Sequence, residues 1–200
     1  SYRRVVDMVK ADALYLHLNP LQEALQPGGD TNFSGLLSKI KNLVDTIGVP
    51  VFVKEVGHGI SGVVASQLFQ AGVAGVDVAG VGGTSYAWVE SERSKNEEFA
   101  DWFKAVGIPT DEAIRQVASV KPTDKHTVIA SGGVRSPVDG LKALVLGADM
   151  FSAAVPFLKP AMDSPEAIID EIENWKNGLR IAMFASGVKD LQTVKILEFI

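Results

Sequence analysis

The chain has 200 residues, of which 46% are apolar and 22% charged, the usual composition of a single globular domain. Its net charge of −5 argues against a nucleic-acid or membrane surface, and the absence of cysteine excludes disulfides, thiolate catalysis and cysteine-ligated metals. No apolar run reaches the roughly 18 residues of a membrane span. We expect a cytoplasmic protein, because a chain without cysteine suits a reducing compartment.

Five short apolar runs predict β-strands that are buried on both faces, because they are continuously hydrophobic. They cover residues 13–16, 49–53, 73–79, 127–130 and 150–154. Helices with clear starts lie between or after them, at Ser61 to Gln70, from Thr110, from Ser136-Pro137 to Gly147, and from Ser164 to Ala185. We expect the stripe Ile168, Ile169, Ile172 and Trp175 to face the core. The charged stretch 90–108 is predicted to be a long mobile loop.

The repeated order of strand and helix predicts an α/β domain with a parallel sheet and right-handed crossovers. Polar or glycine-rich segments follow each strand, where a TIM barrel and an open doubly wound sheet both place their sites. Five strands are too few for the eight of a closed barrel. An open sheet suits the length, whereas the glycine loops suit the last units of a TIM barrel.

Two segments predict a phosphate site. Ser131-Gly132-Gly133-Val134-Arg135 follows one strand and precedes a helix, so its backbone N–H groups can approach an anion closely. Ala153 and Ala154 end the next strand and leave room for the other side of the same phosphate. Loops after the last two strands of a barrel often bind phosphate. A plain tight turn is the alternative interpretation.

The segment His17-Leu18-Asn19-Pro20-Leu21-Gln22-Glu23 places an imidazole, two carboxamides and a carboxylate within seven residues at the end of a strand. Such a cluster can bind a phosphate together with a hard cation. Mg²⁺ is the natural candidate, because it commonly bridges one carboxylate and substrate phosphates. Glu23 is the predicted metal ligand, although a structural histidine and a solvated glutamate are the simpler interpretation of these residue types.

Three further segments point toward the same end of the strands. Lys54 ends a strand and can supply positive charge beside an electron-rich ring, with Glu55 as its expected ion-pair partner. Thr84 and Ser85 follow the glycine loop that starts at Gly80, which lacks the spacing of a dinucleotide fingerprint. Glu90 lies six residues beyond Thr84 and can reach the same region.

Taken together, these motifs resemble the type 2, flavin-dependent isopentenyl-diphosphate Δ-isomerases, and the resemblance runs over essentially the whole chain. The matching strings are His17 to Glu23, Gln26-Pro27-x-Gly29-Asp30, Val53-Lys54-Glu55-Val56-Gly57-x-Gly59-Ile60-Ser61, Ala79-Gly80-x-Gly82-Gly83-Thr84-Ser85, Ser131 to Arg135, and Met183-x-x-x-Gly187. Members of that family are FMN-binding TIM barrels of greater length. The resemblance places residues 1–200 as one domain at strands four to eight of such a barrel.

The resemblance implies roles for particular residues. His17 and Asn19 would contact a diphosphate substrate, Gln22 would lie at the reacting allyl group, and Glu23 would hold Mg²⁺. The flavin side is expected to use Lys54, Thr84, Ser85, Gly132, Gly133, Arg135, Ala153 and Ala154. Glu90 falls where the family has a site glutamate, and Tyr86 replaces an expected tryptophan.

The implied reaction interconverts isopentenyl and dimethylallyl diphosphate without net redox change, with NADPH needed only to reduce FMN. The family's tendency to assemble implies a homo-oligomer.

Three other interpretations stay open. One is another flavin barrel, such as a hydroxy-acid oxidase, and another is a phosphosugar barrel without flavin. The third is a non-catalytic assembly fragment.

Overall fold

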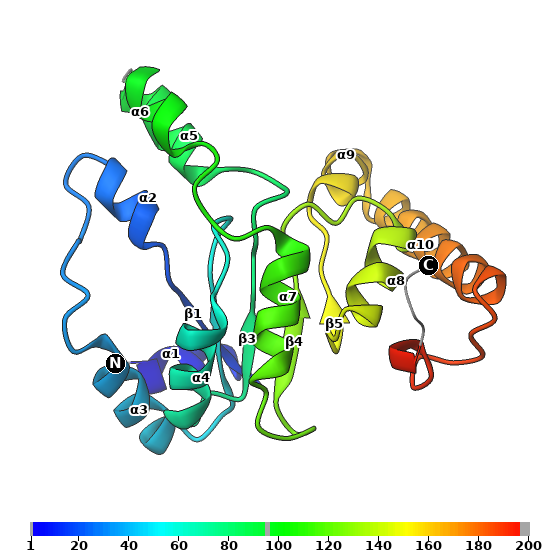
Figure 1. Ribbon diagram of the computed structural model, residues 1–200, viewed down its shortest axis with the longest axis horizontal. Coiled ribbons are helices and arrows are strands. Elements are labelled where there is room, and N and C mark those ends of the chain that lie inside the picture. Colours follow the sequence, from blue (N-terminus) through cyan, green and yellow to red (C-terminus); the bar gives the residue numbers. More distant parts are fainter. Residues whose placement is uncertain (1, 95–96, 197–200) are drawn as a thin grey trace.

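The computed structural model describes residues 2–94 and 97–196. Its strands form one parallel sheet in which every strand lies beside its neighbour in sequence (Figure 1). The strands are β1 (Leu14–His17), β2 (Val51–Lys54), β3 (Gly75–Asp77), β4 (Thr127–Ala130) and β5 (Met150–Phe151). A doubly wound sheet reverses its strand order at a switch point, whereas a barrel does not. The sheet is therefore an arc of a barrel.

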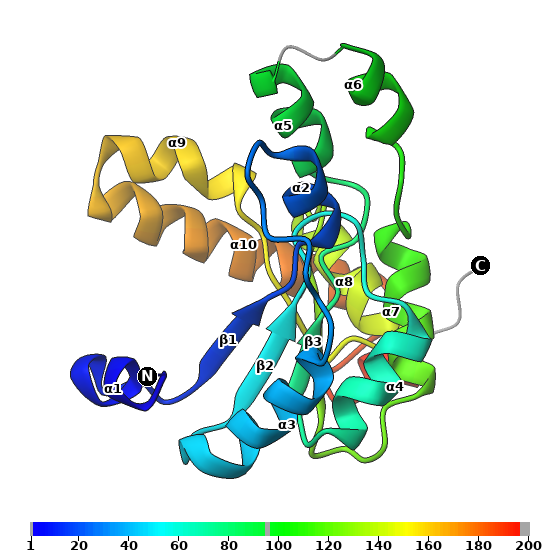
Figure 2. The ribbon, with the colours of Figure 1, turned by 90° about the vertical axis from the view of Figure 1, so that its left-hand side faces the viewer.

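The helices of the described part of the chain fall into three groups. One group packs on the outer face of the sheet, as Figures 1 and 2 show: α3 (Leu36–Ile47), α4 (Gly62–Gln70), α7 (Thr110–Ser119) and α8 (Pro137–Val145). A second group follows the carboxyl ends of strands: α2 (Pro20–Leu25), α5 (Tyr86–Ser94), α6 (Glu97–Phe103) and α9 (Val155–Asp163). The others are α1 (Tyr2–Val9), α10 (Pro165–Ala185) and the 3₁₀ turn η1 (Val194–Ile196).

Alternation along the strands separates a core face from a concave face. Val53, Val76 and Val128 point outward and are fully buried against the helices. The concave face carries the residues between them, and the register places His17 opposite Lys54 and Lys54 opposite Asp77. The pairing thus brings three ionisable side chains side by side at the carboxyl ends of the strands.

The concave face also bears exposed apolar side chains. Tyr15 stacks on Phe52 with ring centroids 5.0 Å apart, yet Tyr15 remains 45% exposed and Met150 49% exposed. Within residues 2–94 and 97–196, neither β1 nor β5 has a strand on its outer edge. This is the surface that a closed barrel would cover.

The predicted helix starts are confirmed. Ser61, Ser136 and Ser164 each accept a hydrogen bond from the backbone N–H three residues later, and α7 begins at Thr110 as expected. Such side-chain acceptors satisfy donors that have no partner inside the helix. Local capping chemistry was therefore a sound guide to where the helices begin.

Two local predictions are wrong. The stretch 90–108 is not an extended loop, because α5 and α6 occupy most of its described residues; residues 95 and 96 lie outside the described part. The stripe on α10 is not core throughout, since Trp175 is buried whereas Ile169 and Ile172 are 58% and 43% exposed. Periodicity identified the helix, but it could not say whether another element covers that face.

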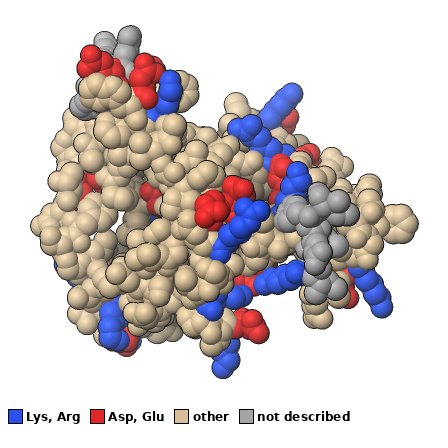
Figure 3. Space-filling model, viewed as in Figure 1, with Lys and Arg blue, Asp and Glu red and all other residues tan. Residues whose placement is uncertain are grey.

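The surface gives no sign of a polyanion-binding face in the view of Figure 3, where acidic and basic residues are interspersed. Throughout the described residues, no helix is both long enough and apolar enough to cross a membrane.

Candidate active site at the carboxyl ends of the strands

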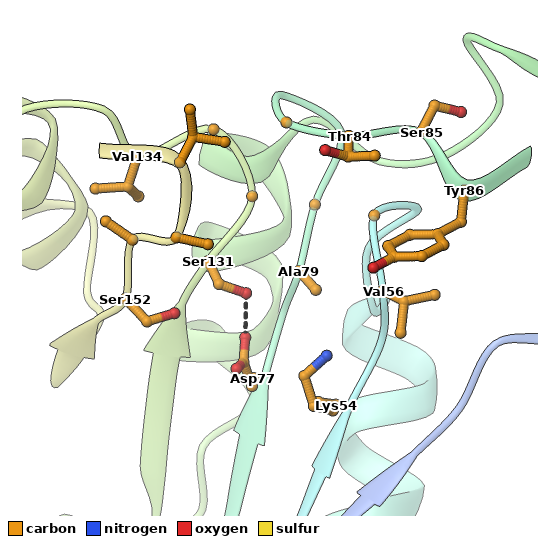
Figure 4. Close-up of a pocket in the computed structure, with 18 of the residues that line it drawn as sticks. Lys54, Val56, Asp77, Ala79, Thr84, Ser85, Tyr86, Ser131, Val134 and Ser152 are labelled. Carbon is orange, nitrogen blue, oxygen red and sulfur yellow. Dashed lines mark hydrogen bonds between the residues drawn. The ribbon is translucent and has the colours of Figure 1, made fainter. Parts of the chain in front are cut away.

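A cleft of about 790 Å³ lies at the carboxyl ends of the strands (Figure 4). It brings together segments that are more than a hundred residues apart in the sequence. The predicted residues that line it are His17, Lys54, Thr84, Ser85, Gly132, Gly133, Arg135, Ala153 and Ala154.

The two glycine loops of the cleft pack directly on each other. A Cβ atom on Gly132 would meet the carbonyl oxygen of Gly80, and one on Gly133 would meet that of Gly82. Both Gly132 and Gly133 also have positive φ angles, 99° and 82°. Thr110 Oγ1 donates to the carbonyl oxygen of Gly132 at 2.7 Å. Glycine is therefore required here both for backbone conformation and for close approach.

The backbone next to these glycines suits an anion. In the described part of the chain, the N–H groups of Gly132, Gly133, Ala153 and Ala154 have no hydrogen-bond acceptor. Ala154 is also the N-cap of α9, and its side chain provides no cap. Unpaired N–H groups beside a helix N-terminus form a site for phosphate. These residues therefore fit the phosphate of a nucleotide cofactor.

Lys54 reaches the cleft, but its predicted ion pair with Glu55 is wrong. Lys54 Nζ donates to the backbone carbonyl oxygen of Glu55 at 2.7 Å. The buried Glu55 carboxylate instead accepts from the N–H groups of Val56, Gly57 and His58 at 2.6–2.9 Å. The Lys54 ammonium group is therefore left without a carboxylate in direct contact among the described residues.

His58 and His126 both lie in loops. Nδ1 of the buried His58 lies 3.5 Å from Glu55 Oε1, outside hydrogen-bond geometry. His126 Nδ1 lies 3.0 Å from Thr123 Oγ1. Both pairs are local to their loops, so neither histidine joins the cleft.

His17 is the last residue of β1 and lines both the cleft and a neighbouring pocket. Burial and the nearby Lys54 charge together lower the pKa of His17. Its imidazole is therefore neutral at pH 7 and can act as both donor and acceptor. A neutral imidazole can donate a hydrogen bond to an anionic ligand without placing a second positive charge beside Lys54.

Asn19 and Glu23 belong to the neighbouring pocket and do not line the main cleft. The Glu23 carboxylate accepts from the N–H of Asp30 at 2.8 Å, from Asn19 Nδ2 at 3.0 Å and from Gln26 Nε2 at 2.7 Å. The bonds from Asp30 and Asn19 lower the pKa of Glu23, so it is ionised. The described residues contain no group of three or more His, Cys, Asp or Glu that could hold a metal.

Gln22 and Glu90 form a separate contact that joins α2 to α5. Gln22 Nε2 donates to Glu90 Oε1 at 3.0 Å, although the two residues are 68 positions apart. Glu90 is only 2% exposed and pairs with Arg93 at 3.0 Å. The predicted glutamate is thus placed beside the predicted glutamine, and neither is among the residues that line the main cleft.

Sequence reasoning missed Asp77, which lines the cleft and is 6% exposed. Its carboxylate accepts a hydrogen bond from Ser131 Oγ, as the dashed line in Figure 4 marks. Burial raises the pKa of Asp77, while the Ser131 bond and the Lys54 charge oppose that shift. An acidic residue inside an apolar strand was the available signal.

Comparison with known proteins now adds the family. Residues 30–197 match the family described as FMN-dependent dehydrogenase. The chain therefore belongs to the FMN-dependent dehydrogenase family. Its fold is that of the TIM barrels to which this family belongs, of which the five strands form a part.

Within that class, two similar curated proteins share a name. The chain is 46% identical over 199 residues to the isopentenyl-diphosphate delta-isomerase of Nostoc sp., and 49% identical over 200 residues to that of Pseudescherichia vulneris. In each case the match covers 96% of this chain but only 55% and 56% of the relative. The chain thus spans about half the length of these relatives, and its resemblance to these isomerases is confirmed.

Solved structures show the same architecture at low sequence identity. A GMP reductase from Trypanosoma brucei, solved with guanosine 5'-triphosphate, matches 98% of this chain and 42% of its own at a TM-score of 0.67 and 22% identity. A lactate oxidase from Pediococcus acidilactici matches 98% and 56% at a TM-score of 0.70 and 20% identity. These likenesses support the barrel fold alone.

Proposed function

We propose that the protein is an FMN-dependent isopentenyl-diphosphate isomerase, which uses Mg²⁺ for its substrate and NADPH to keep the flavin reduced. The observation that carries the proposal is the juxtaposition of an anion-binding cleft with the His17–Glu23 segment, in a chain 46–49% identical to isomerases of that name. The proposed reaction moves a double bond within a small diphosphate ester.

The cleft would hold FMN through its backbone. The unpaired N–H groups at Gly132, Gly133, Ala153 and Ala154 would bind the phosphate, and Arg135 would add positive charge beside it. Lys54, Thr84 and Ser85 would contact the rest of the cofactor. When bound in its reduced form, FMN supplies an electron-rich ring that can exchange protons with an alkene. The surrounding cleft would orient that ring and exclude water.

The neighbouring pocket would take the substrate. His17 lines both cavities and is neutral, so it can donate a hydrogen bond to a ligand that spans them. Asn19 would orient the diphosphate from the second cavity. Gln22 is a neutral carboxamide held by Glu90, so its proposed part is to orient the reacting group or to pass a proton between stronger groups.

Glu23 is the proposed magnesium ligand. Its ionised carboxylate keeps lone pairs free beyond the three hydrogen bonds that fix its position. Mg²⁺ retains several waters and commonly binds through one carboxylate and two phosphate oxygens. A site with a single protein carboxylate is therefore compatible with Mg²⁺ that arrives with a diphosphate.

The test is an isomerase assay on the intact protein with isopentenyl diphosphate, FMN, NADPH and Mg²⁺. We expect turnover by the wild type and at least a tenfold loss for Glu23→Gln, partly recovered at high Mg²⁺ because the weakened ligand raises the metal concentration required. Glu92→Gln, an exposed glutamate on α5, is the matched control. Equal turnover of wild type and Glu23→Gln would refute the metal assignment.

The same samples separate the alternatives. A yellow protein that oxidises hydroxy acids but leaves isopentenyl diphosphate unchanged would be a different flavin enzyme. A colourless protein that binds a phosphosugar would contradict the FMN site itself. A stable oligomer without bound FMN would favour an assembly role. The homo-oligomer that we expect for the active protein is measured by light scattering.

A further inference from the structure

The buried carboxylate of Asp77 lies at a junction of the cleft. Strand register places it opposite Lys54 on the concave face, and Lys54 in turn opposite His17. Ser131 follows β4 on the other side of Asp77 and donates to it. Figure 4 shows Lys54, Asp77 and Ser131 in this order along the floor of the cleft. A row of polar side chains thus runs from the end of β1 to the residue that follows β4.

Each neighbour of Asp77 controls a different wall of the cleft. Ser131 directly precedes Gly132 and Gly133, and its carbonyl oxygen accepts from the N–H of Gly80 at 3.1 Å. Ala79 directly precedes the Gly80 loop and has a positive φ of 38°, which is strained for a residue with a Cβ. By accepting the hydrogen bond from Ser131, the Asp77 carboxylate fixes the start of the Gly132 loop, and the bond from Gly80 to Ser131 links the second glycine loop to it.

Lys54 is coupled to the same carboxylate by charge alone. The ammonium group donates to the carbonyl oxygen of Glu55, and it makes no direct ion pair with Asp77. The two charges still interact, because the Lys54 charge opposes the effect of burial on Asp77. Burying a carboxylate without a contacting cation is unfavourable for folding. Asp77 therefore needs an explanation other than stability.

We propose that Asp77 is a positioning residue of the cofactor cleft, which joins the two glycine loops and places a fixed negative charge beneath the ligand, opposite Lys54. The inference rests on the proposed FMN site. A fixed negative charge disfavours added negative charge on a ligand nearby, and Lys54 favours it. The pair would thereby set how much more tightly the cleft binds reduced FMN than oxidised FMN.

The experiment compares Asp77→Asn with the wild type of the intact protein. Asparagine keeps an acceptor oxygen for Ser131 but removes the charge. We expect the dissociation constant of oxidised FMN divided by that of reduced FMN to rise by about tenfold. The reason is that the Asp77 charge no longer repels the added negative charge of reduced FMN. The melting temperature should stay equal or increase, because a buried charge has gone.

Two further variants divide charge from hydrogen bonding. Lys54→Met should move the FMN ratio in the opposite direction, and the double variant should depart from additivity because the charges interact. Ser131→Ala should weaken both forms of FMN alike, since it loosens the glycine loop without changing charge. An unchanged ratio in Asp77→Asn, or a ratio effect that adds fully to that of Lys54→Met, would overturn the proposal.

A measurement without FMN distinguishes this proposal from the proposed function. Acetylation of Lys54 by acetic anhydride, followed by peptide mass spectrometry, should be several-fold faster in Asp77→Asn, because the ammonium group loses a stabilising charge. Acetylation of Lys41, an exposed lysine of α3 that is paired with Asp45, is the internal standard. If Lys54 is acetylated faster in Asp77→Asn but the protein does not bind FMN, the interaction between Asp77 and Lys54 is supported and the proposed FMN site is refuted. An Asp77→Asn protein that unfolds would show that Asp77 is only structural.

Discussion

The Glu55 carboxylate determines the path of the loop that follows β2. It accepts three consecutive backbone N–H groups, those of Val56, Gly57 and His58, while the backbone carbonyl oxygen of the same residue holds Lys54 Nζ. Charged acceptors of backbone N–H groups make stronger bonds than neutral ones. One residue therefore anchors the loop and orients the cation of the cleft.

This anchoring predicts a pH-dependent contribution to stability. Although burial works to raise it, the nearby His58 and the hydrogen bonds from backbone N–H groups lower the pKa of Glu55 below its ordinary 4.5. A lowered carboxylate pKa stabilises the fold above the ordinary value, and this is lost as pH falls through the folded-state value. We expect Glu55→Gln to reduce the unfolding free energy by about 1–3 kcal/mol at pH 7 and much less near pH 3.

Urea denaturation of Glu55→Gln and wild type at these two pH values measures the difference. Glu92→Gln, which alters an exposed carboxylate, should leave the unfolding free energy within about 0.5 kcal/mol of wild type. A deficit of Glu55→Gln that stays the same from pH 7 to pH 3 would contradict the assignment of the effect to the ionised carboxylate.

At the scale of elements, the site depends on contact between the loops that follow β3 and β4. Glycine is needed at Gly133 because a side chain would press on the carbonyl of Gly82, and Thr110 at the start of α7 ties down the same turn. The loops thus form one unit, which α9 joins through Ala153 and Ala154 in the cleft lining. Their geometry should respond to one added methyl group.

Gly133→Ala tests this unit. We expect FMN affinity to fall by at least tenfold, and the unfolding free energy to fall by about 1–3 kcal/mol, because the variant adds a contact to a positive φ. Gly187→Ala is the matched control, since Gly187 has φ of 71° with nothing near its Cβ position. It should lose about 1 kcal/mol and keep its FMN affinity. Flavin fluorescence titration and urea denaturation give both quantities.

At the scale of the whole molecule, the concave face of the sheet is open. Tyr15 and Met150 are about half exposed there, and the outer edges of β1 and β5 are unpaired within the described residues. Unpaired edges and apolar surface favour association with another chain. The same face would form the interior of a complete barrel, so its exposure is a property of the 200-residue chain.

We expect the isolated 200-residue chain to associate, with a mass by light scattering well above 21.3 kDa. Met150→Lys should reduce the association, because it puts a charge on the concave face. Phe184→Lys, which changes an 87% exposed residue of α10, should have a smaller effect if the concave face is responsible. A monomer near 21 kDa that unfolds cooperatively would contradict this expectation.

Much of the fold was predictable from local patterns. Continuous apolar runs indicated the five parallel strands, and Ser61, Ser136 and Ser164 marked helix starts through hydrogen bonds to the backbone three residues later. The strand ends were less accurate: the predicted strands 73–79 and 150–154 are shorter, at Gly75–Asp77 and Met150–Phe151, and His17 is the last residue of β1 instead of following it. These predictions succeeded because strand burial and helix capping depend on residues close in sequence.

Motif and composition by themselves determined the class of fold, the glycine-rich loops and the segments that meet at the cleft. Only the tertiary structure decided that the Glu55 carboxylate binds backbone N–H groups and does not pair with Lys54. It also decided that Gln22 contacts Glu90 and that Asp77 lies between Lys54 and Ser131. Each of these depends on strand register or on contacts between distant segments. These contacts form only when the strands pair and the helices pack on the sheet, so the pattern of residues near each position cannot predict them.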